Sequence, residues 1–192
     1  LGLFDPAQEA SPRPDHVRAW DDLTPEFRDR ERRRMAASAA LIDRVDQEIG
    51  RLVADLERSG ELDNTLILFF SDNGACPYDR RALGPDDEPY NPDVMWSDST
   101  GWAWARNTPF RYYKQNQFEG GISSPAIMHW PAGLKTKPGA LVNTPAHLVD
   151  ILPTLAAVAD APIPESWPGR DLTPLAGVSL APIYAGSSLP AR

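Results

Sequence analysis

The segment TLILFFSDNG, at residues 65–74, limits the possible folds of this chain more than any other part of the sequence. Its first six residues are mostly apolar and do not alternate with polar side chains, which favours a strand buried on both faces. Such strands are typical of parallel sheets that helices cover on both sides. The run ends in Ser-Asp-Asn-Gly. We therefore predict a buried strand that carries a carboxylate and an amide at its carboxyl end.

A long amphipathic helix is predicted directly before this strand. Thr24, Pro25 and Glu26 supply a hydroxyl N-cap, a proline at the first helical position and an acid in the first turn. Apolar residues then recur at helical spacing as far as Ser59 and Gly60. The run RDRERRR within this helix mixes both charges, so we predict a solvated helix face rather than a polyanion site. A helix followed by a buried strand indicates an α/β layer.

The rest of the chain is predicted to extend the same α/β domain. Residues 125–130, PAIMHW, indicate a second strand, and residues 144–159 indicate an apolar helix that Pro153 kinks or restarts. We expect a sheet of mostly parallel strands flanked by helices, incomplete at both ends of the chain. The predicted organisation of residues 1–192 is an irregular lead-in at 1–23, a core at 24–160 with an insertion at 75–107, and a Pro/Gly-rich tail at 161–192.

The composition is that of a globular chain. Its 192 residues, with 42% hydrophobic and 24% charged side chains, are enough for one sizeable core. The formal net charge of −8 disfavours nonspecific binding to nucleic acid. No apolar run approaches the roughly 18 residues of a membrane span, and we expect no signal peptide in this sequence. The single cysteine, Cys76, excludes an internal disulfide. The oligomeric state is left open.

Asp72 and Asn73 admit two interpretations. Ligands of open α/β sheets bind at the carboxyl ends of the strands, and both side chains offer oxygen atoms suited to Ca²⁺ or Mg²⁺. Ser, Asp, Asn and Gly are also the commonest turn residues, so an ordinary turn explains the same stretch. Ca²⁺ takes about six to eight oxygen ligands, so two residues would form only part of a site. From this segment alone, a turn and a metal site both remain open.

A second group of residues lies further along the chain. Residues 106–131 read RNTPFRYYKQNQFEGGISSPAIMHWP, in which Lys114 precedes Glu119-Gly120-Gly121 and a predicted strand follows. Together with the strand that ends in S-D-N-G, this order resembles the sulfatase family of the alkaline-phosphatase-like superfamily. The segments LIDRVDQEIGRL and AHLVDILPTL also resemble that family. The resemblance covers roughly residues 16–185 and implies an alkaline-phosphatase-like α/β fold.

The resemblance also implies an activity and a site. The chain would be part of an arylsulfatase-type hydrolase that cleaves a small-molecule or sugar sulfate ester with a divalent cation. Asp72 and Asn73 would be two ligands of that cation, with Ca²⁺ favoured over Mg²⁺. Lys114 would be the catalytic residue that contacts the sulfate oxygens, because hydrolysis builds negative charge on the nonbridging and leaving oxygens. A periplasmic or secreted location is implied as well.

Other polar residues near these segments are predicted to be structural. Glu119 is expected to form a structural hydrogen bond, while the two glycines after it permit a tight turn near the site. Arg106 and Arg111 are expected at the surface or in structural pairs. His147 is expected to be a structural histidine, helped by Asp150. The other two histidines, His16 and His129, lack a metal-ligand partner at useful spacing.

Cys76 is not expected to be the nucleophile. The family resemblance implies a cysteine in C-x-P-x-R that is converted to formylglycine, whereas CPYDR at residues 76–80 has its proline one position early and follows S-D-N-G. We expect Cys76 to be a small loop residue, with formylglycine upstream of Leu1 and with this chain inactive by itself. Two alternatives remain: a phosphatase or phosphonate monoester hydrolase of the same superfamily, and a noncatalytic remnant or interaction module.

Overall fold

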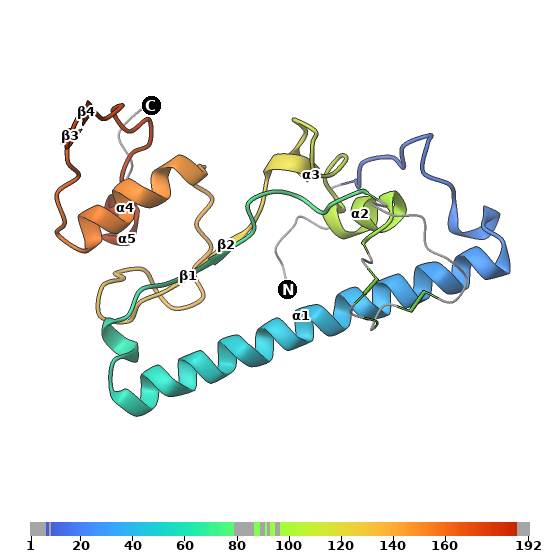
Figure 1. Cartoon of the computed structure of the whole chain (residues 1–192), viewed down its shortest axis with the longest axis horizontal. Coiled ribbons are helices and arrows are strands. Elements are labelled where there is room, and N and C mark those ends of the chain that lie inside the picture. Colours follow the sequence, from blue (N-terminus) through green and yellow to red (C-terminus); the bar gives the residue numbers. More distant parts are fainter. Residues whose placement is uncertain are drawn as a thin grey trace. The chain divides into compact units, whose positions relative to one another are not determined.

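The computed structural model of the chain describes residues 7, 9–78, 87–88, 91, 93–94 and 97–187. The chain divides into two compact units, whose helices and strands are labelled in Figure 1. Unit 1 comprises Leu1–Asp55 and Phe69–Ile127, and unit 2 comprises Leu56–Leu68 and Met128–Arg192.

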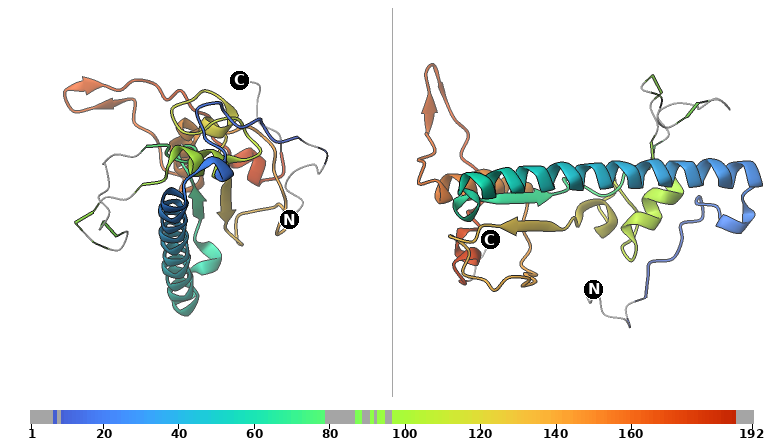
Figure 2. Two further views of the ribbon diagram at one scale, coloured as in Figure 1. Left: turned by 90° about the vertical axis from the view of Figure 1, so that its right-hand side faces the viewer. Right: turned by 90° about the horizontal axis from the view of Figure 1, so that it is seen from below.

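The helix α1, Pro25–Ser59, confirms the long helix predicted from its N-cap and its apolar periodicity. The backbone N–H of Phe27 donates to Thr24 Oγ1 at 3.3 Å, so the threonine caps the helix as expected. Both views of Figure 2 draw α1 as one uninterrupted helix. After α1, Gly60 adopts a φ of 74°, the left-handed conformation that commonly terminates helices and favours glycine.

Two charged residues of α1 are buried, so the prediction that RDRERRR forms a solvated helix face is partly wrong. Glu31 and Arg34 are each 4% exposed. Arg34 Nε lies 3.3 Å from Glu31 Oε1, and Arg34 Nη1 donates to the carbonyl oxygen of Ser97 at 2.8 Å. The mixed charges correctly indicated a polar helix face. They did not indicate that residues far along the chain cover part of it.

A second helix, α2 at Thr100–Asn107, packs against this part of α1 within unit 1 (Figure 2). Ser99 caps α2 by accepting the backbone N–H of Trp102 at 3.3 Å, and its hydroxyl donates to the carboxylate of Glu31. Trp102 Nε1 donates to the carbonyl oxygen of Glu31 at 2.8 Å. The insertion therefore contains a helix that the sequence did not predict, and a tryptophan of that helix packs on α1.

The two predicted strands are confirmed as β1, Ile67–Phe70, and β2, Ala126–His129, which pair with each other. Burial on both faces of β1 is not found in the described residues, because Phe69 is 49% and Phe70 is 37% exposed. A covered parallel sheet needs further strands and helices on both faces. The predicted sheet of mostly parallel strands is not present among the described residues, which form two-stranded sheets instead.

The remaining elements of the described chain are short. The strands β3, Ser166–Trp167, and β4, Arg170–Asp171, form an antiparallel hairpin. The other short elements are η1 at Trp20–Asp22, η2 at Leu62–Asn64, α3 at Glu119–Ile122 and α5 at Ala181–Tyr184.

The helix predicted at residues 144–159 is shorter than expected. A 3₁₀ turn, η3 at Leu148–Asp150, leads into α4 at Ile151–Val158. Pro153 lies in the first turn of α4, where its missing N–H has no intrahelical partner, so the proline accompanies a helix start rather than a kink. His147 caps η3, since its Nδ1 accepts a backbone N–H at 3.2 Å, which is a structural role as predicted.

Unit 2 is organised around the carboxylate of Asp150, which is fully buried. Its two oxygens accept the backbone N–H groups of His147 at 2.7 Å and Val178 at 3.0 Å. The hydroxyl of Thr154 donates to the carbonyl oxygen of Asp150 at 2.6 Å and accepts the N–H of Leu180 at 2.8 Å. These bonds join α4 to the segment that leads into α5.

Part of the apolar face of α1 is exposed in the described structure. The exposed fractions reach 69% for Leu41, 58% for Ile42, 49% for Val45 and 54% for Leu52. These residues are among the apolar positions whose helical spacing predicted the helix. The amphipathic pattern is therefore present, but the described residues do not cover this part of the apolar face. Among the described helices, none combines the length and the apolar character that crossing a lipid bilayer requires.

The variant Arg34→Ala is expected to lower the free energy of unfolding by about 3–5 kcal/mol, because removing one partner leaves the other charge of a buried ion pair in place. Denaturant titration measures this loss. Arg33→Ala is the matched control, since the side chain of Arg33 is 42% exposed and pairs with Asp29 and Glu88. A much smaller loss is expected for the control. Equal losses in the two variants would contradict the burial of the Glu31–Arg34 pair.

Candidate functional site

The polar loop after β1 lies against the glycine pair Gly120-Gly121 within unit 1. The backbone N–H of Gly74 donates to the carbonyl oxygen of Gly121 at 3.0 Å. One residue further on, the carbonyl oxygen of Ala75 accepts the backbone N–H of Lys114 at 3.1 Å. These two hydrogen bonds bring the segment that carries Lys114 alongside the loop after β1.

Glycine is required at this contact because the backbones approach more closely than a side chain allows. A Cβ atom at Gly74 would overlap the carbonyl oxygen of Gly120, and one at Gly120 would overlap the carbonyl oxygen of Tyr112. A Cβ atom at Gly121 would overlap the carbonyl oxygen of Asn116. The close approach predicted for the two glycines is therefore confirmed, and Gly74 is the partner that the sequence did not identify.

The side chain of Asn107, the last residue of α2, joins the same two segments. Its Oδ1 accepts the backbone N–H of Ala75 at 3.3 Å, and its Nδ2 donates to the carbonyl oxygen of Tyr112 at 3.2 Å. Sequence reasoning did not single out Asn107. An asparagine in front of Thr-Pro is an ordinary turn signal, so only the spatial arrangement reveals the bridge.

Tyr112 and Tyr113, which directly precede Lys114, pack against each other and against His16. Tyr113 is 8% exposed, and this burial is the largest cause of its raised pKa, with Tyr112 and Tyr78 acting in the same direction. The Tyr113 hydroxyl forms a hydrogen bond of 2.6 Å with His16 Nε2. His16 thus has a structural contact beside the candidate site that the sequence did not indicate.

The two arginines near the site have structural partners, as predicted. The guanidinium of Arg111 lies 4.1 Å from the ring centroid of Phe118 and 5.0 Å from that of Tyr112, which are cation–π distances. Arg106, in the last turn of α2, forms an ion pair with Asp98.

Asp72 and Asn73 lie in a bend directly after β1, in line with the turn, which is one of the two interpretations that the sequence left open. The hydroxyl of Ser71 donates to the carbonyl oxygen of Asn73 at 2.8 Å, which closes a turn. Within the described residues, neither the exposed carboxylate of Asp72 nor the half-buried amide of Asn73 forms a side-chain hydrogen bond or ion pair. Their oxygens are hard donors that fit Ca²⁺ or Mg²⁺. The described part of the chain contains no group of three or more His, Cys, Asp or Glu residues placed to hold a metal ion.

The family model described as Sulfatase matches residues 6–161, which is more than half of the chain. The chain belongs to the sulfatase family. An uncharacterized sulfatase of Schizosaccharomyces pombe is 33% identical over 172 residues, covering 81% of this chain and 30% of that protein. An arylsulfatase of Klebsiella aerogenes is 30% identical over 176 residues, covering 85% of this chain and 38% of that protein. The sulfatase family implies an alkaline-phosphatase-like α/β fold.

The relatives are much longer than this sulfatase-family chain. A steryl-sulfatase of Mus musculus is 35% identical over 136 residues, which covers 70% of this chain but 19% of the relative. The chain thus spans 19% to 38% of these three proteins. Members of the family typically use a metal ion and a formylglycine residue.

The hydrogen bonds described above do not involve the other residues that the sequence singled out: Glu119, Cys76 and His129. Glu119 is the exposed first residue of α3, and its carboxylate makes no hydrogen bond with the described residues, contrary to the expected structural one. Cys76 is a half-buried free thiol next to Ala75, and Arg80 of the same motif lies outside the described residues. His129 is exposed in β2.

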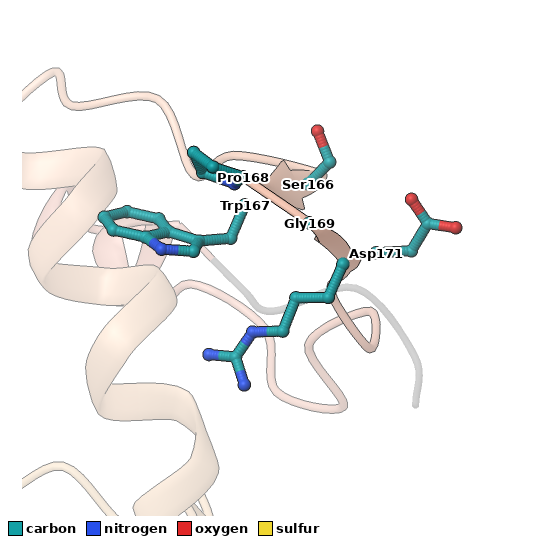
Figure 3. A pocket seen from close by; sticks show the side chains of 6 residues that line it. Ser166, Trp167, Pro168, Gly169 and Asp171 are labelled. Atoms are coloured by element: carbon teal, nitrogen blue, oxygen red, sulfur yellow. The ribbon is translucent and has the colours of Figure 1, made fainter.

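A hollow of about 640 Å³ lies in unit 2, on the β3–β4 hairpin. All six residues that line it, from Ser166 to Asp171, are exposed. Figure 3 shows the side chains of Ser166 and Asp171 pointing away from the indole of Trp167. Polar groups do not converge there, so the hollow is the surface of a hairpin rather than a built site.

The variant Gly120→Ala is expected to lower the free energy of unfolding by about 1–3 kcal/mol, because the added methyl group overlaps a backbone oxygen that cannot move aside cheaply. Gly50→Ala is the matched control, since a Cβ at Gly50 in α1 meets nothing within 4 Å. The control is expected to gain up to about 1 kcal/mol from the better helix propensity of alanine. Denaturant titration compares the two. A Gly120→Ala variant as stable as the unsubstituted chain would contradict the close backbone approach.

Proposed function

We propose that the protein carrying this chain hydrolyses a sulfate ester with a divalent cation, and that this chain supplies part of the metal and sulfate site. One observation carries the proposal: the segment of Lys114 is hydrogen-bonded to the loop that contains Asp72 and Asn73, in a chain of the sulfatase family. Two oxygen donors and an ammonium group on adjacent segments suit the recognition of an anion together with its cation.

Asp72 and Asn73 would hold the cation, with Ca²⁺ favoured over Mg²⁺. Their side-chain oxygens have no protein partner among the described residues, so they are available as ligands. Two ligands are fewer than either ion requires, and the others would come from parts of the protein outside this chain. When bound, the cation would supply positive charge that offsets the negative charge developing on the sulfate oxygens.

Lys114 would bind the sulfate group itself. An ammonium group is a compact point charge with three donors, which suits a tetrahedral anion. The side chain of Lys114 is half-buried and forms no ion pair with the described residues, while its backbone is fixed to Ala75. Lys114 would stabilise the negative charge that grows as the bond between sulfur and the alcohol oxygen breaks.

The nucleophile would come from outside this chain. We infer a formylglycine upstream, so the 192-residue chain alone is expected to leave sulfate esters intact. Relatives named arylsulfatase and steryl-sulfatase suggest an aryl or steryl sulfate as the substrate. A periplasmic or secreted location remains part of the proposal, on the family resemblance alone.

The same proposal extends to the sheet. We infer that β1 and β2 belong to a larger, mostly parallel sheet in the complete catalytic domain. The exposed phenylalanines of β1 support this inference, because apolar side chains on a central strand require a covering layer.

The variant Asp72→Ala tests the proposed function in the full-length protein. The kcat/KM for an aryl sulfate at saturating Ca²⁺ is expected to fall by about 100-fold or more, because a charged cation ligand is lost. Asp46→Ala is the matched control, since Asp46 is an exposed carboxylate on α1. The activity of this control variant should equal that of the wild type. Circular dichroism checks that both variants stay folded.

Three results, from the variant, from the isolated chain and from a second substrate, would contradict the proposal. An Asp72→Ala variant as active as the wild type would remove Asp72 from the site. Turnover by the isolated 192-residue chain would contradict the external nucleophile. Faster turnover of an aryl phosphate than of an aryl sulfate would favour the phosphatase alternative.

A further inference from the structure

The amide of Asn107 connects the two segments on which the proposed function depends. Its Oδ1 accepts the N–H of Ala75 at 3.3 Å, two residues beyond Asn73. Its Nδ2 donates to the carbonyl oxygen of Tyr112 at 3.2 Å, two residues before Lys114. One side chain therefore bonds to the backbone on both sides of the candidate site.

The chemistry of these two bonds requires a carboxamide. One bond needs an acceptor facing a backbone N–H, and the other needs a donor facing a backbone carbonyl oxygen. Among side chains of this size, only asparagine offers both groups on one planar unit. Aspartate keeps the acceptor but would place a charged oxygen against the Tyr112 carbonyl, and alanine loses both bonds.

The backbone that Asn107 holds has an uncommon conformation. Tyr112 adopts a φ of 61°, a left-handed conformation that is unfavourable for a bulky aromatic residue. The same Tyr112 carbonyl lies so close to Gly120 that a Cβ there would overlap it. Residues held in such conformations persist when surrounding bonds fix them. The Asn107 amide is one of the bonds that fix Tyr112.

Asn107 is itself presented from an anchored helix. It is the last residue of α2, whose Trp102 donates to the Glu31 carbonyl oxygen of α1 at 2.8 Å. The carbonyl oxygen of Asn107 also accepts the N–H of Phe110 at 2.9 Å, which fixes the chain just after the helix. A side chain on a fixed helix end has little freedom to follow a moving loop, so it acts as a rigid support.

We propose that Asn107 is a positioning residue that sets the location of Lys114 relative to Asp72 and Asn73. This inference rests on the proposed function, because it assigns Asn107 a role in that same site. Asn107 touches neither the cation nor the sulfate group. It acts through the backbone of Ala75 and Tyr112, and a displacement of about 1 Å between reacting groups can lower a rate by about 100-fold.

The test uses the full-length protein with three variants: Asn107→Ala, Asn107→Asp and the control Thr108→Ala. Thr108 adjoins Asn107, and its hydroxyl donates only within this turn, to the carbonyl oxygen of Trp104 at 3.3 Å. Amide hydrogen exchange at single-residue resolution is followed at Ala75 and Lys114. Michaelis–Menten kinetics with an aryl sulfate and Ca²⁺ affinity by calorimetry are measured on the same samples.

We expect the exchange patterns to differ between the variants. In Asn107→Ala, the amides of Ala75 and Lys114 should both exchange faster. In Asn107→Asp, Ala75 should stay protected because the acceptor remains, while Lys114 exchanges faster. The kcat of both variants should fall about 10- to 100-fold with KM changed less than about threefold. Thr108→Ala should match the wild type in all readouts. General destabilisation would instead raise exchange throughout the chain and would not separate Ala75 from Lys114.

Each contrary result identifies what has failed. Unchanged exchange at Ala75 and Lys114 in Asn107→Ala overturns the bridge. Faster exchange with an unchanged kcat overturns the positioning role. A wild-type protein that neither binds Ca²⁺ nor turns over the aryl sulfate overturns the proposed function, and with it the role of Asn107 in that reaction.

Discussion

The contact of Gly74 with Gly120 and Gly121 determines how the candidate site is assembled. Two backbone segments can approach this closely only if neither carries a side chain at the point of contact. The hydrogen bond from the N–H of Gly74 to the carbonyl oxygen of Gly121 aligns the two segments. The bond from the N–H of Lys114 to the carbonyl oxygen of Ala75 lies next to it. The segment that carries Asp72 and Asn73 therefore lies next to the segment that carries Lys114, although the lysine comes much later in the sequence.

This contact is supported from the side by α2 and, through α2, by α1. The charges of Glu31 and Arg34 are buried beneath residues that lead into α2, so the packing of that helix is tied to a polar cluster with specific geometry. Buried polar groups are costly unless their partners are in place, which favours a single arrangement of α2. Asn107 lies at the end of α2, and its amide bonds to the backbone of both segments of the candidate site.

Much of the local structure could be predicted from the sequence, because it depends on neighbouring residues. The cap at Thr24, the helix after it and the strands β1 and β2 follow from spacing and composition alone. The placement of Lys114 near the loop after β1, which carries Asp72, was implied by the family resemblance and not by any pattern within the segment. Their chemical roles remain predictions.

The rest could not be predicted because it depends on partners distant in sequence. Arg34 looked like a surface residue because its covering residue, Ser97, lies 63 positions away. Asn107 looked like part of a turn because its two partners come from different loops. The apolar run of β1 correctly indicated a strand, but the burial on both faces that it also predicted is not found in the described residues, where Phe69 and Phe70 are exposed.

We propose that Asp72, Asn73 and Lys114 form one side of a cation-dependent sulfate site. A crystal structure of the full-length protein grown with Ca²⁺ and bound sulfate tests it most directly. We expect a cation about 2.3–2.6 Å from oxygens of Asp72 and Asn73. We also expect the ammonium of Lys114 at about 3 Å from an oxygen of the sulfate. A cation bound elsewhere, or a Lys114 side chain directed away from the sulfate, would contradict it.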